Sequence, residues 1–149
     1  MPITWNTKTF EELSTQELYQ ILRLRSEVFV VEQNCVYQDI DNKDQKALHL
    51  FGTIEGEIIA HSRLFKPGDY FEFSSIGRVV VAEKYRDKNY GHELIDRSIL
   101  QINNRFNAHN ITISAQLYLK KFYEFHGFIA TSATYLEDDI PHIEMKIIK

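Results

Sequence analysis

The sequence contains a single cysteine, Cys35, among its 149 residues. One cysteine cannot form an internal disulfide and cannot supply a multi-cysteine zinc site. Long apolar runs are also absent, since no stretch approaches the roughly eighteen residues that span a bilayer. The N-terminus lacks the charged-then-apolar form of a signal peptide. We therefore expect a cytoplasmic protein that does not associate with membranes.

The sequence also has fewer basic than acidic residues. The chain has 21 acidic and 17 basic residues, a net charge of −4 and no basic run, so nucleic-acid binding is disfavoured. No two histidines show a recognised ligand spacing with a third partner, and we expect no metal. What is present is an ordinary globular composition, 44% apolar and 26% charged. Its length fits one domain over residues 1–149, with no repeats or linkers.

The most informative stretch runs from residue 76 to residue 106. It opens with branched apolar residues, ending at Val81, that predict a buried strand. It closes with apolar residues at three- and four-residue steps, which predict an amphipathic helix. The connecting loop, 86–92, starts that helix, so several of its backbone amides lack intrahelical partners and favour an anion, above all a phosphate. Asn89 and Gly91 are the residue types that most readily take the positive φ needed to curl amides inward.

The rest of the chain predicts a regular alternation of elements. The expected order is strand, helix, three strands, helix, strand, helix and two strands. Their ranges are a strand at 3–6, a helix from the capping box 14–17 through 29, a hairpin at 48–54 and 58–65, strands at 76–81 and 110–115, a helix at 117–126 ended by Gly127, and an antiparallel pair at 128–134 and 142–148. A strand, a helix and a strand in succession imply a right-handed parallel crossover. We therefore expect an α/β (α+β) fold, a single domain with a mixed central sheet.

Several polar residues have two interpretations at this point. In the hairpin, His49, His61 and Arg63 point either into a site or into solvent. The polar stretch 32–46 is either a wall of a substrate cleft or a solvated loop. Arg78 interrupts the apolar central strand, so it either faces the cleft to meet a carboxylate or forms a structural ion pair.

Three segments resemble a known family. Val81-Ala-Glu-Lys-Tyr-Arg86-Asp-Lys-Asn89-Tyr-Gly91 is similar to the acyl-CoA pyrophosphate loop of the GNAT acyltransferase superfamily, a strand followed by Arg or Gln, two residues, Gly, one residue, and Gly or Ala. Asn89 stands where the first Gly of that pattern usually is. Tyr123-Glu-Phe-His-Gly127-Phe128 resembles the family segment Tyr-x-x-x-Gly-Phe. The run from residue 25 to residue 41 is similar to the ElaA-like branch of the superfamily.

The resemblance implies both a fold and a cofactor site. GNAT proteins have a mixed central sheet with helices on both faces and a splayed parallel strand pair, which admits the pantetheine arm of an acyl-CoA. Gln116 stands where the family often has Asn. The cofactor-binding positions implied are Val79, Val80, Val81, Arg86, Asp87, Lys88, Asn89, Tyr90, Gly91, His92 and Gln116.

The same resemblance makes Tyr123 the acid that protonates the departing thiolate. A phenol holds its proton at neutral pH and can donate it within hydrogen-bond reach. The alternative is a packed tyrosine whose hydroxyl bonds a backbone carbonyl. An alkylammonium must lose a proton before it attacks, and the candidate bases are Glu32 and His142. Nothing beside Cys35 supports an acyl-accepting role for its thiol.

We therefore expect an N-acyltransferase that moves an acetyl group from acetyl-CoA to a primary amine, on a small molecule or a peptide. Direct attack in a ternary complex fits the absence of a credible covalent nucleophile. The alternative is a noncatalytic CoA-binding or interaction module with the same fold. A monomer and a homodimer are both compatible with the sequence.

Overall fold

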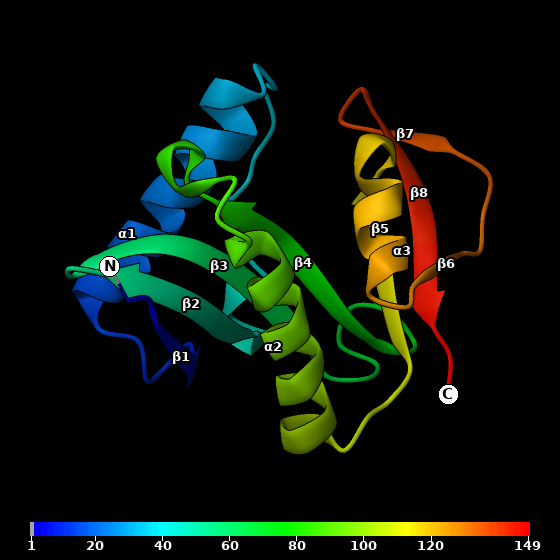
Figure 1. Cartoon of the computed structure of the whole chain (residues 1–149), viewed down its shortest axis with the longest axis horizontal. Coiled ribbons are helices and arrows are strands. Elements are labelled where there is room, and N and C mark those ends of the chain that lie inside the picture. Colours follow the sequence, from blue (N-terminus) through cyan, green and yellow to red (C-terminus); the bar gives the residue numbers. More distant parts are fainter. Residues whose placement is uncertain (1) are drawn as a thin grey trace.

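The computed structural model describes residues 2–149, which form one mixed sheet covered by helices on both faces (Figure 1). Within these residues the strand order is β1-β2-β3-β4-β5-β8-β6, and β7 pairs with β8. The strands are β1 (Thr4–Thr9), β2 (Leu48–Ile54), β3 (Glu57–Phe65), β4 (Ser74–Val81), β5 (Ile111–Gln116), β6 (Ile129–Ala130), β7 (Tyr135–Glu137) and β8 (Ile140–Ile147). The α-helices are α1 (Thr15–Arg25), α2 (Tyr90–Phe106) and α3 (Lys120–Phe125).

Strand β4 is parallel to β5 and antiparallel to β3. On the β3 side, pairing runs along the strand from Ser75 to Val81. On the β5 side it stops after two pairs, Ser74 with Ile111 and Ser75 with Thr112. The two parallel strands diverge beyond this point, which confirms the splayed pair. The second half of β4 therefore has no neighbouring strand on that side.

Alternation along β3 shows which helix covers which face of the sheet. Ser62 Oγ lies 2.8 Å from Ser98 Oγ of α2. The next residue, Arg63, shares the carboxylate of Asp44 with Arg25 of α1. Because successive side chains of a strand point to opposite faces, α1 and α2 cover opposite faces of the sheet. Figure 1 shows the same arrangement.

Helix α1 begins at the predicted capping box and then changes its winding. The amide of Glu17 donates to Ser14 Oγ at 3.0 Å, and the amide of Ser14 donates to the Glu17 carboxylate at 2.9 Å. These two bonds satisfy amides that a helix start leaves without partners. From Ser26 to Glu32 the chain continues as a π-helix, a rare form that is frequent at functional sites.

The apolar core is divided into two clusters, and β4 contributes residues to both. One cluster joins α1, β2, β3 and the start of α2 and includes Ile21, Leu24, Phe51, Ile59 and Leu94. The other joins α2, β5, β8 and the residue after Gly127 and includes Ile95, Ile102, Ile113, Phe128 and Met145. Val79 of β4 packs against both clusters, so the central strand is their common boundary.

The predicted elements are present, with changed bounds. Strand β1 continues to Thr9, and the helix predicted at 117–126 begins with the 3₁₀ turn Leu117–Leu119. The predicted closing pair has three strands, because β6 and β7 both pair with β8. Gly127 ends α3 with a φ of 97°, as a left-handed cap. No helix within residues 2–149 combines the length and the apolar character needed to cross a membrane.

Candidate active site

A cleft of about 550 Å³ occupies the divergence between β4 and β5. This volume lies within the range of ligand-binding pockets, roughly 300–1,000 Å³. Lys88 is exposed and outside the lining. All the other predicted site residues line the cleft: Glu32, Val79, Val80, Val81, Arg86, Asp87, Asn89, Tyr90, Gly91, His92, Gln116, Tyr123 and His142. Among residues 2–149, no three His, Cys, Asp or Glu side chains are grouped to hold a metal ion.

The loop between β4 and α2 curls at two residues in the left-handed region, Asp87 with a φ of 67° and Asn89 with a φ of 64°. The expectation of positive φ at Gly91 is wrong, because α2 already begins at Tyr90 and the glycine has the helical backbone of its first turn. No side chain of the described residues caps this end of α2. The amides from Tyr90 to His92 therefore have no intrahelical partner. Together with the helix dipole, they form an anion site that opens into the cleft.

Arg86 and Glu32 form an ion pair at the edge of this anion site. The guanidinium donates to the two carboxylate oxygens at 2.5 and 2.9 Å, and its Nε donates to the carbonyl of Val81 at 3.1 Å. The hydrogen bonds from Arg86 hold the pKa of Glu32 below its usual range. Glu32 is consequently a weak proton acceptor. Arg86, which we predicted to meet a phosphate, is already paired with this carboxylate.

Tyr123 is 6% exposed and packs edge-on against Phe122 and Phe128, with ring centroids 5.1 and 5.9 Å away. Burial raises the pKa of its hydroxyl, so the proton stays on the oxygen at neutral pH. Within the described residues this hydroxyl makes no hydrogen bond, and the side chain lines the cleft. Its proton is therefore available to a group bound in the cleft.

His142 enters the cleft from β8, opposite Gln116 of β5. Its Nδ1 lies 2.7 Å from the carbonyl oxygen of Ile140. A carbonyl can only accept, so Nδ1 carries the proton, and in the neutral ring Nε2 has the lone pair. Nε2 is 3.5 Å from a carboxylate oxygen of Glu137. The histidine is 6% exposed, and its basic nitrogen faces a carboxylate.

Two side-chain contacts bridge the cleft. Gln33, at the end of the π-helix, exchanges two amide hydrogen bonds with Gln116, at 3.3 and 3.2 Å. The thiol of Cys35 donates to the carbonyl of Asp138 at 3.3 Å. These contacts join the N-terminal part of the fold to β5 and to the turn before β8.

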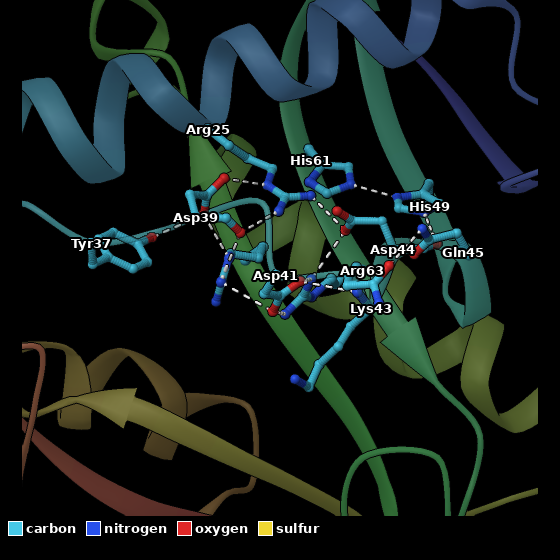
Figure 2. Close-up of polar contacts among 12 residues, drawn as sticks. Arg25, Tyr37, Asp39, Asp41, Lys43, Asp44, Gln45, His49, His61 and Arg63 are labelled. Carbon is cyan, nitrogen blue, oxygen red and sulfur yellow. Dashed lines mark hydrogen bonds and ion pairs between the residues drawn. The ribbon is translucent and has the colours of Figure 1, made fainter.

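The loop that follows the π-helix is anchored in the interior by ion pairs (Figure 2). Arg25 bonds Asp39 at 2.9 Å and Asp44 at 2.7 Å. Arg63 bonds Asp44 at 3.0 Å and Asp41 at 2.6 Å. Asp39 and Asp41 lie outside the cleft lining. These carboxylates, which we expected either on a cleft wall or in solvent, hold the loop to the core.

Arg78 completes this network from the central strand. Its Nε lies 2.7 Å from Asp39, and its Nη2 lies 3.3 Å from Asp41. Of the two alternatives for Arg78, the structure shows the ion pair. Tyr37 also bonds Asp39, at 2.9 Å. Tyr37 and Arg78 line the cleft, so the network positions one wall of the site.

His49 and His61 extend the network under α1. Both are fully buried, and the expectation that they face a site or solvent is wrong, as it is for Arg63. His49 Nε2 donates to the carbonyl of Asp44 at 2.9 Å, and its Nδ1 lies 3.0 Å from His61 Nε2. Burial lowers the pKa of both rings, which keeps them neutral. The physical reason is that this face of β3 is covered, and a strand pattern does not reveal what covers it.

A second histidine pair supports the start of α2. His92 Nδ1 lies 2.9 Å from His126 Nε2, and His126 Nδ1 lies 2.9 Å from the carboxylate of Asp96. His92 also packs against Phe122, with ring centroids 4.7 Å apart. The chain from Asp96 to His92 orients a ring at the anion site. Sequence reasoning missed His126 and Asp96, because only the fold brings α3 against α2.

Comparison with known proteins agrees with this geometry. A family model described as "Acetyltransferase (GNAT) domain" matches residues 9–149. The chain therefore belongs to the GNAT acyltransferase superfamily. It is 39% identical to Protein ElaA of Escherichia coli strain K12 over 145 residues, which cover 96% of this chain and 95% of that protein. Within the superfamily this similarity places it in the ElaA-like branch.

Solved structures give the same result. The crystal structure of Escherichia coli ElaA matches with a TM-score of 0.91 at 38% identity, covering 97% of this chain and 99% of that one. An acyl-CoA N-acyltransferase from Pseudomonas aeruginosa matches with a TM-score of 0.94 at 38% identity, covering 99% and 100%. A GNAT family acetyltransferase from Elizabethkingia anophelis with acetyl-CoA bound shares the fold, with a TM-score of 0.65 at 17% identity over 97% of both chains.

Proposed function

We propose that this protein transfers an acetyl group from acetyl-CoA to a primary amine by direct attack in a ternary complex. The observation that carries the proposal is the hydroxyl of Tyr123, which lines the cleft without a hydrogen-bond partner among residues 2–149. A tyrosine that served packing alone would satisfy its hydroxyl within the protein. Membership of the GNAT superfamily supports an acyl-CoA donor. The acetyl-CoA bound in the fold relative from Elizabethkingia anophelis supports acetyl as the group transferred.

The donor is held mainly by backbone. The amides at the start of α2 and the curled loop before it receive the pyrophosphate, because they offer several N–H donors at the positive end of a helix. The peptide groups of β4 around Val79, on the side from which β5 has diverged, bind the amides of the pantetheine arm, as a neighbouring strand would. The carbonyl of Val81 already accepts from Arg86. His92, held in place by His126, and Arg86 lie at the same end of the cleft.

The acceptor loses its proton to His142. An ammonium cannot attack, and Nε2 of the neutral ring has the lone pair that takes one proton from it. The amine nitrogen then bonds the thioester carbon and the carbon–sulfur bond breaks. Tyr123 gives its proton to the sulfur. As the amide forms, the nitrogen loses a second proton, which replaces the one that Tyr123 gave to the sulfur and restores the phenol. We favour His142 over Glu32 because Arg86 already occupies the Glu32 carboxylate.

Direct attack is supported by the state of the single cysteine. An acyl-accepting thiol needs a neighbouring base that makes it a thiolate. The thiol of Cys35 instead donates to the carbonyl of Asp138. It holds a turn in place.

The test is the Tyr123→Phe variant, assayed by thiol release from acetyl-CoA with a panel of primary amines. We expect kcat to fall by about 100-fold, the usual contribution of a positioned acid, with unchanged CoA affinity by calorimetry. Tyr19→Phe, the same change at an exposed position of α1, is the matched control and should behave as wild type. Wild-type turnover in Tyr123→Phe would contradict the acid role. CoA binding without turnover on any amine would instead indicate a noncatalytic module.

A further inference from the structure

Hydrogen bonds link three polar side chains, Tyr135, Ser114 and Glu137, at the end of the cleft formed by β5, β7 and the turn before β8. Ser114 Oγ is 2.5 Å from the hydroxyl of Tyr135 and 3.1 Å from Glu137 Oε1. The other carboxylate oxygen of Glu137 is 3.5 Å from Nε2 of His142. Ser114, Glu137 and His142 all line the cleft. The pyrophosphate loop, the splayed strands and Tyr123 do not require these three linked side chains.

The chemistry of the groups fixes the direction of each hydrogen bond. An ionised carboxylate only accepts, so Ser114 gives its single proton to Glu137. The serine oxygen must then accept from Tyr135, whose pKa is raised by burial and which therefore keeps its proton. Neither bond involves the second carboxylate oxygen of Glu137, which receives no donor from Ser114 or Tyr135. Ser114 and Tyr135 thus position the carboxylate and leave one of its oxygens free.

The free oxygen faces a second acceptor. Nδ1 of His142 donates to the carbonyl of Ile140, so in the neutral ring Nε2 presents a lone pair to Glu137. The ring is more than nine-tenths buried and opens onto the cleft. Two acceptors 3.5 Å apart repel each other unless a donor lies beside both. A cationic group with at least two N–H bonds meets both acceptors at once, whereas a proton on Nε2 would pair the ring with Glu137 directly.

We propose that Glu137 and His142 together bind a primary alkylammonium, and that this is the acceptor's amino group. The inference deepens the proposed function and rests on it in one respect, that the bound ammonium is the group that is acylated. One N–H bonds Glu137 Oε2 and another bonds His142 Nε2. Glu137 holds the positive charge, and His142 is then placed to remove a proton. Carboxylates and neutral alcohols are poor ligands for this site, since neither supplies a positive charge with two donors.

The neighbouring charges favour a cation here as well. Asp138 lines the same end of the cleft. The guanidinium of Arg78, which also lines the cleft, is matched by Asp39 and Asp41. An ammonium therefore enters a negative end of the cleft. The need for two N–H donors, one for each acceptor, excludes tertiary and quaternary ammonium groups.

The experiment uses the full chain without an acyl donor and titrates it with n-butylammonium, with tetramethylammonium and butanol as probes that lack either the N–H donors or the charge. Nitrogen NMR of the histidine rings and calorimetry are the readouts. We expect butylammonium alone to bind and to fix the Nδ1–H form of His142. Glu137→Gln should weaken binding by about tenfold or more, the loss of one charge-assisted hydrogen bond. Asp139→Asn removes the same charge from the same turn, at an exposed position outside the cleft lining, and should change little.

Equal affinity in Glu137→Gln and wild type, or equal binding of tetramethylammonium, would overturn the inference. Ser114→Ala gives a second measure, because a merely structural serine would leave the butylammonium affinity and the His142 signal unchanged. In turnover assays, Glu137→Gln should raise the KM for the amine and leave the KM for acetyl-CoA as it is. Because the titration contains no acyl donor, a failure to bind CoA would refute the proposed function and leave the ammonium site standing.

Discussion

The buried cluster around Arg25 and the cleft cluster around Glu137 contain similar side chains and differ in how their charges are matched. In the buried cluster three guanidinium groups meet three carboxylates, and every carboxylate contacts at least two cationic or donor groups. In the cleft cluster, within residues 2–149, the carboxylate of Glu137 faces one histidine ring and no guanidinium or ammonium group. Matched charge holds the fold together, whereas unmatched charge is available to a ligand.

The difference also shows that acidic residues in a sequence do not by themselves indicate a site. Asp39 and Asp41 lie in a polar segment between elements, and Glu137 is the last residue of the short strand β7. Two of them are taken up by arginines of α1, β3 and β4, and one is left with an oxygen free. The partners decide the role of each carboxylate, and those partners are distant in sequence.

The largest effect is expected from breaking the matched cluster. Asp44→Asn removes the carboxylate that bonds both Arg25 and Arg63 and leaves two buried guanidinium groups short of charge. We expect a loss of about 3–5 kcal/mol in the free energy of unfolding, measured by urea denaturation. Lys120→Gln breaks an exposed pair with Glu124 and should cost less than about 1 kcal/mol. Equal losses in the two variants would show that burial does not distinguish these pairs.

The next effect concerns the unmatched cluster. His142→Gln keeps a donor for the carbonyl of Ile140 and removes the basic nitrogen. We expect turnover to fall by about 100-fold, with unchanged stability and with partial rescue by added imidazole, measured by thiol release. If His142→Gln keeps wild-type turnover and Glu32→Gln loses it, the proton acceptor is Glu32.

Acid should weaken the matched cluster in two stages. Burial lowers the pKa of His49 and His61, so the unfolded chain takes up protons that the folded chain refuses, and stability is lost as the pH falls below about 6.5. Although desolvation opposes it, Arg63 holds the pKa of Asp41 at about 2. This contribution, on the order of 2 kcal/mol, is present above about pH 4 and is lost as the pH falls towards 2. Urea denaturation between pH 8 and pH 2 measures both stages, and Glu137→Gln should follow the wild-type curve.

The smallest effect concerns the pair of Glu32 and Arg86. This pair is matched in charge, unlike Glu137, but it is exposed, unlike the cluster around Arg25. Glu32→Gln removes the carboxylate that occupies Arg86 and frees its guanidinium for a phosphate. Because exposed pairs are worth less than about 1 kcal/mol, we expect CoA affinity to rise by about threefold. Calorimetry with CoA measures it. Glu27→Gln, on the same helical segment and outside the cleft lining, is the control, and a lower affinity in Glu32→Gln would contradict the competition.

The order of elements was predictable because each has a clear period or cap. The periodic apolar residues of α2, the capping box at Ser14 and the cap at Gly127 each specify a local structure that tertiary contacts did not alter. The splayed strands were expected only from the family resemblance, since no local pattern states where two strands separate.

The buried cluster was not predictable from the polar stretch 32–46, because such a stretch looks the same whether it is solvated or anchored. The available signal was in its partners: Arg25 interrupts the apolar face of α1, and Arg63 and His61 interrupt an apolar face of β3. At the cleft, the chain from Tyr135 to Glu137 was missed for a similar reason. Ser114 alternates with the apolar residues of β5, which indicated a polar face and not what that face contacts.

The gap between β4 and β5 places part of the recognition surface in the main chain. Peptide groups are the same whatever side chain they carry, so substitutions from Val79 to Val81 can alter packing without deleting a donor or an acceptor. A binding surface of this kind tolerates sequence drift and is hard to abolish by point mutation. In the proposed complex with an acyl-CoA, substitutions along this part of β4 should therefore leave the main-chain contacts with the pantetheine arm in place.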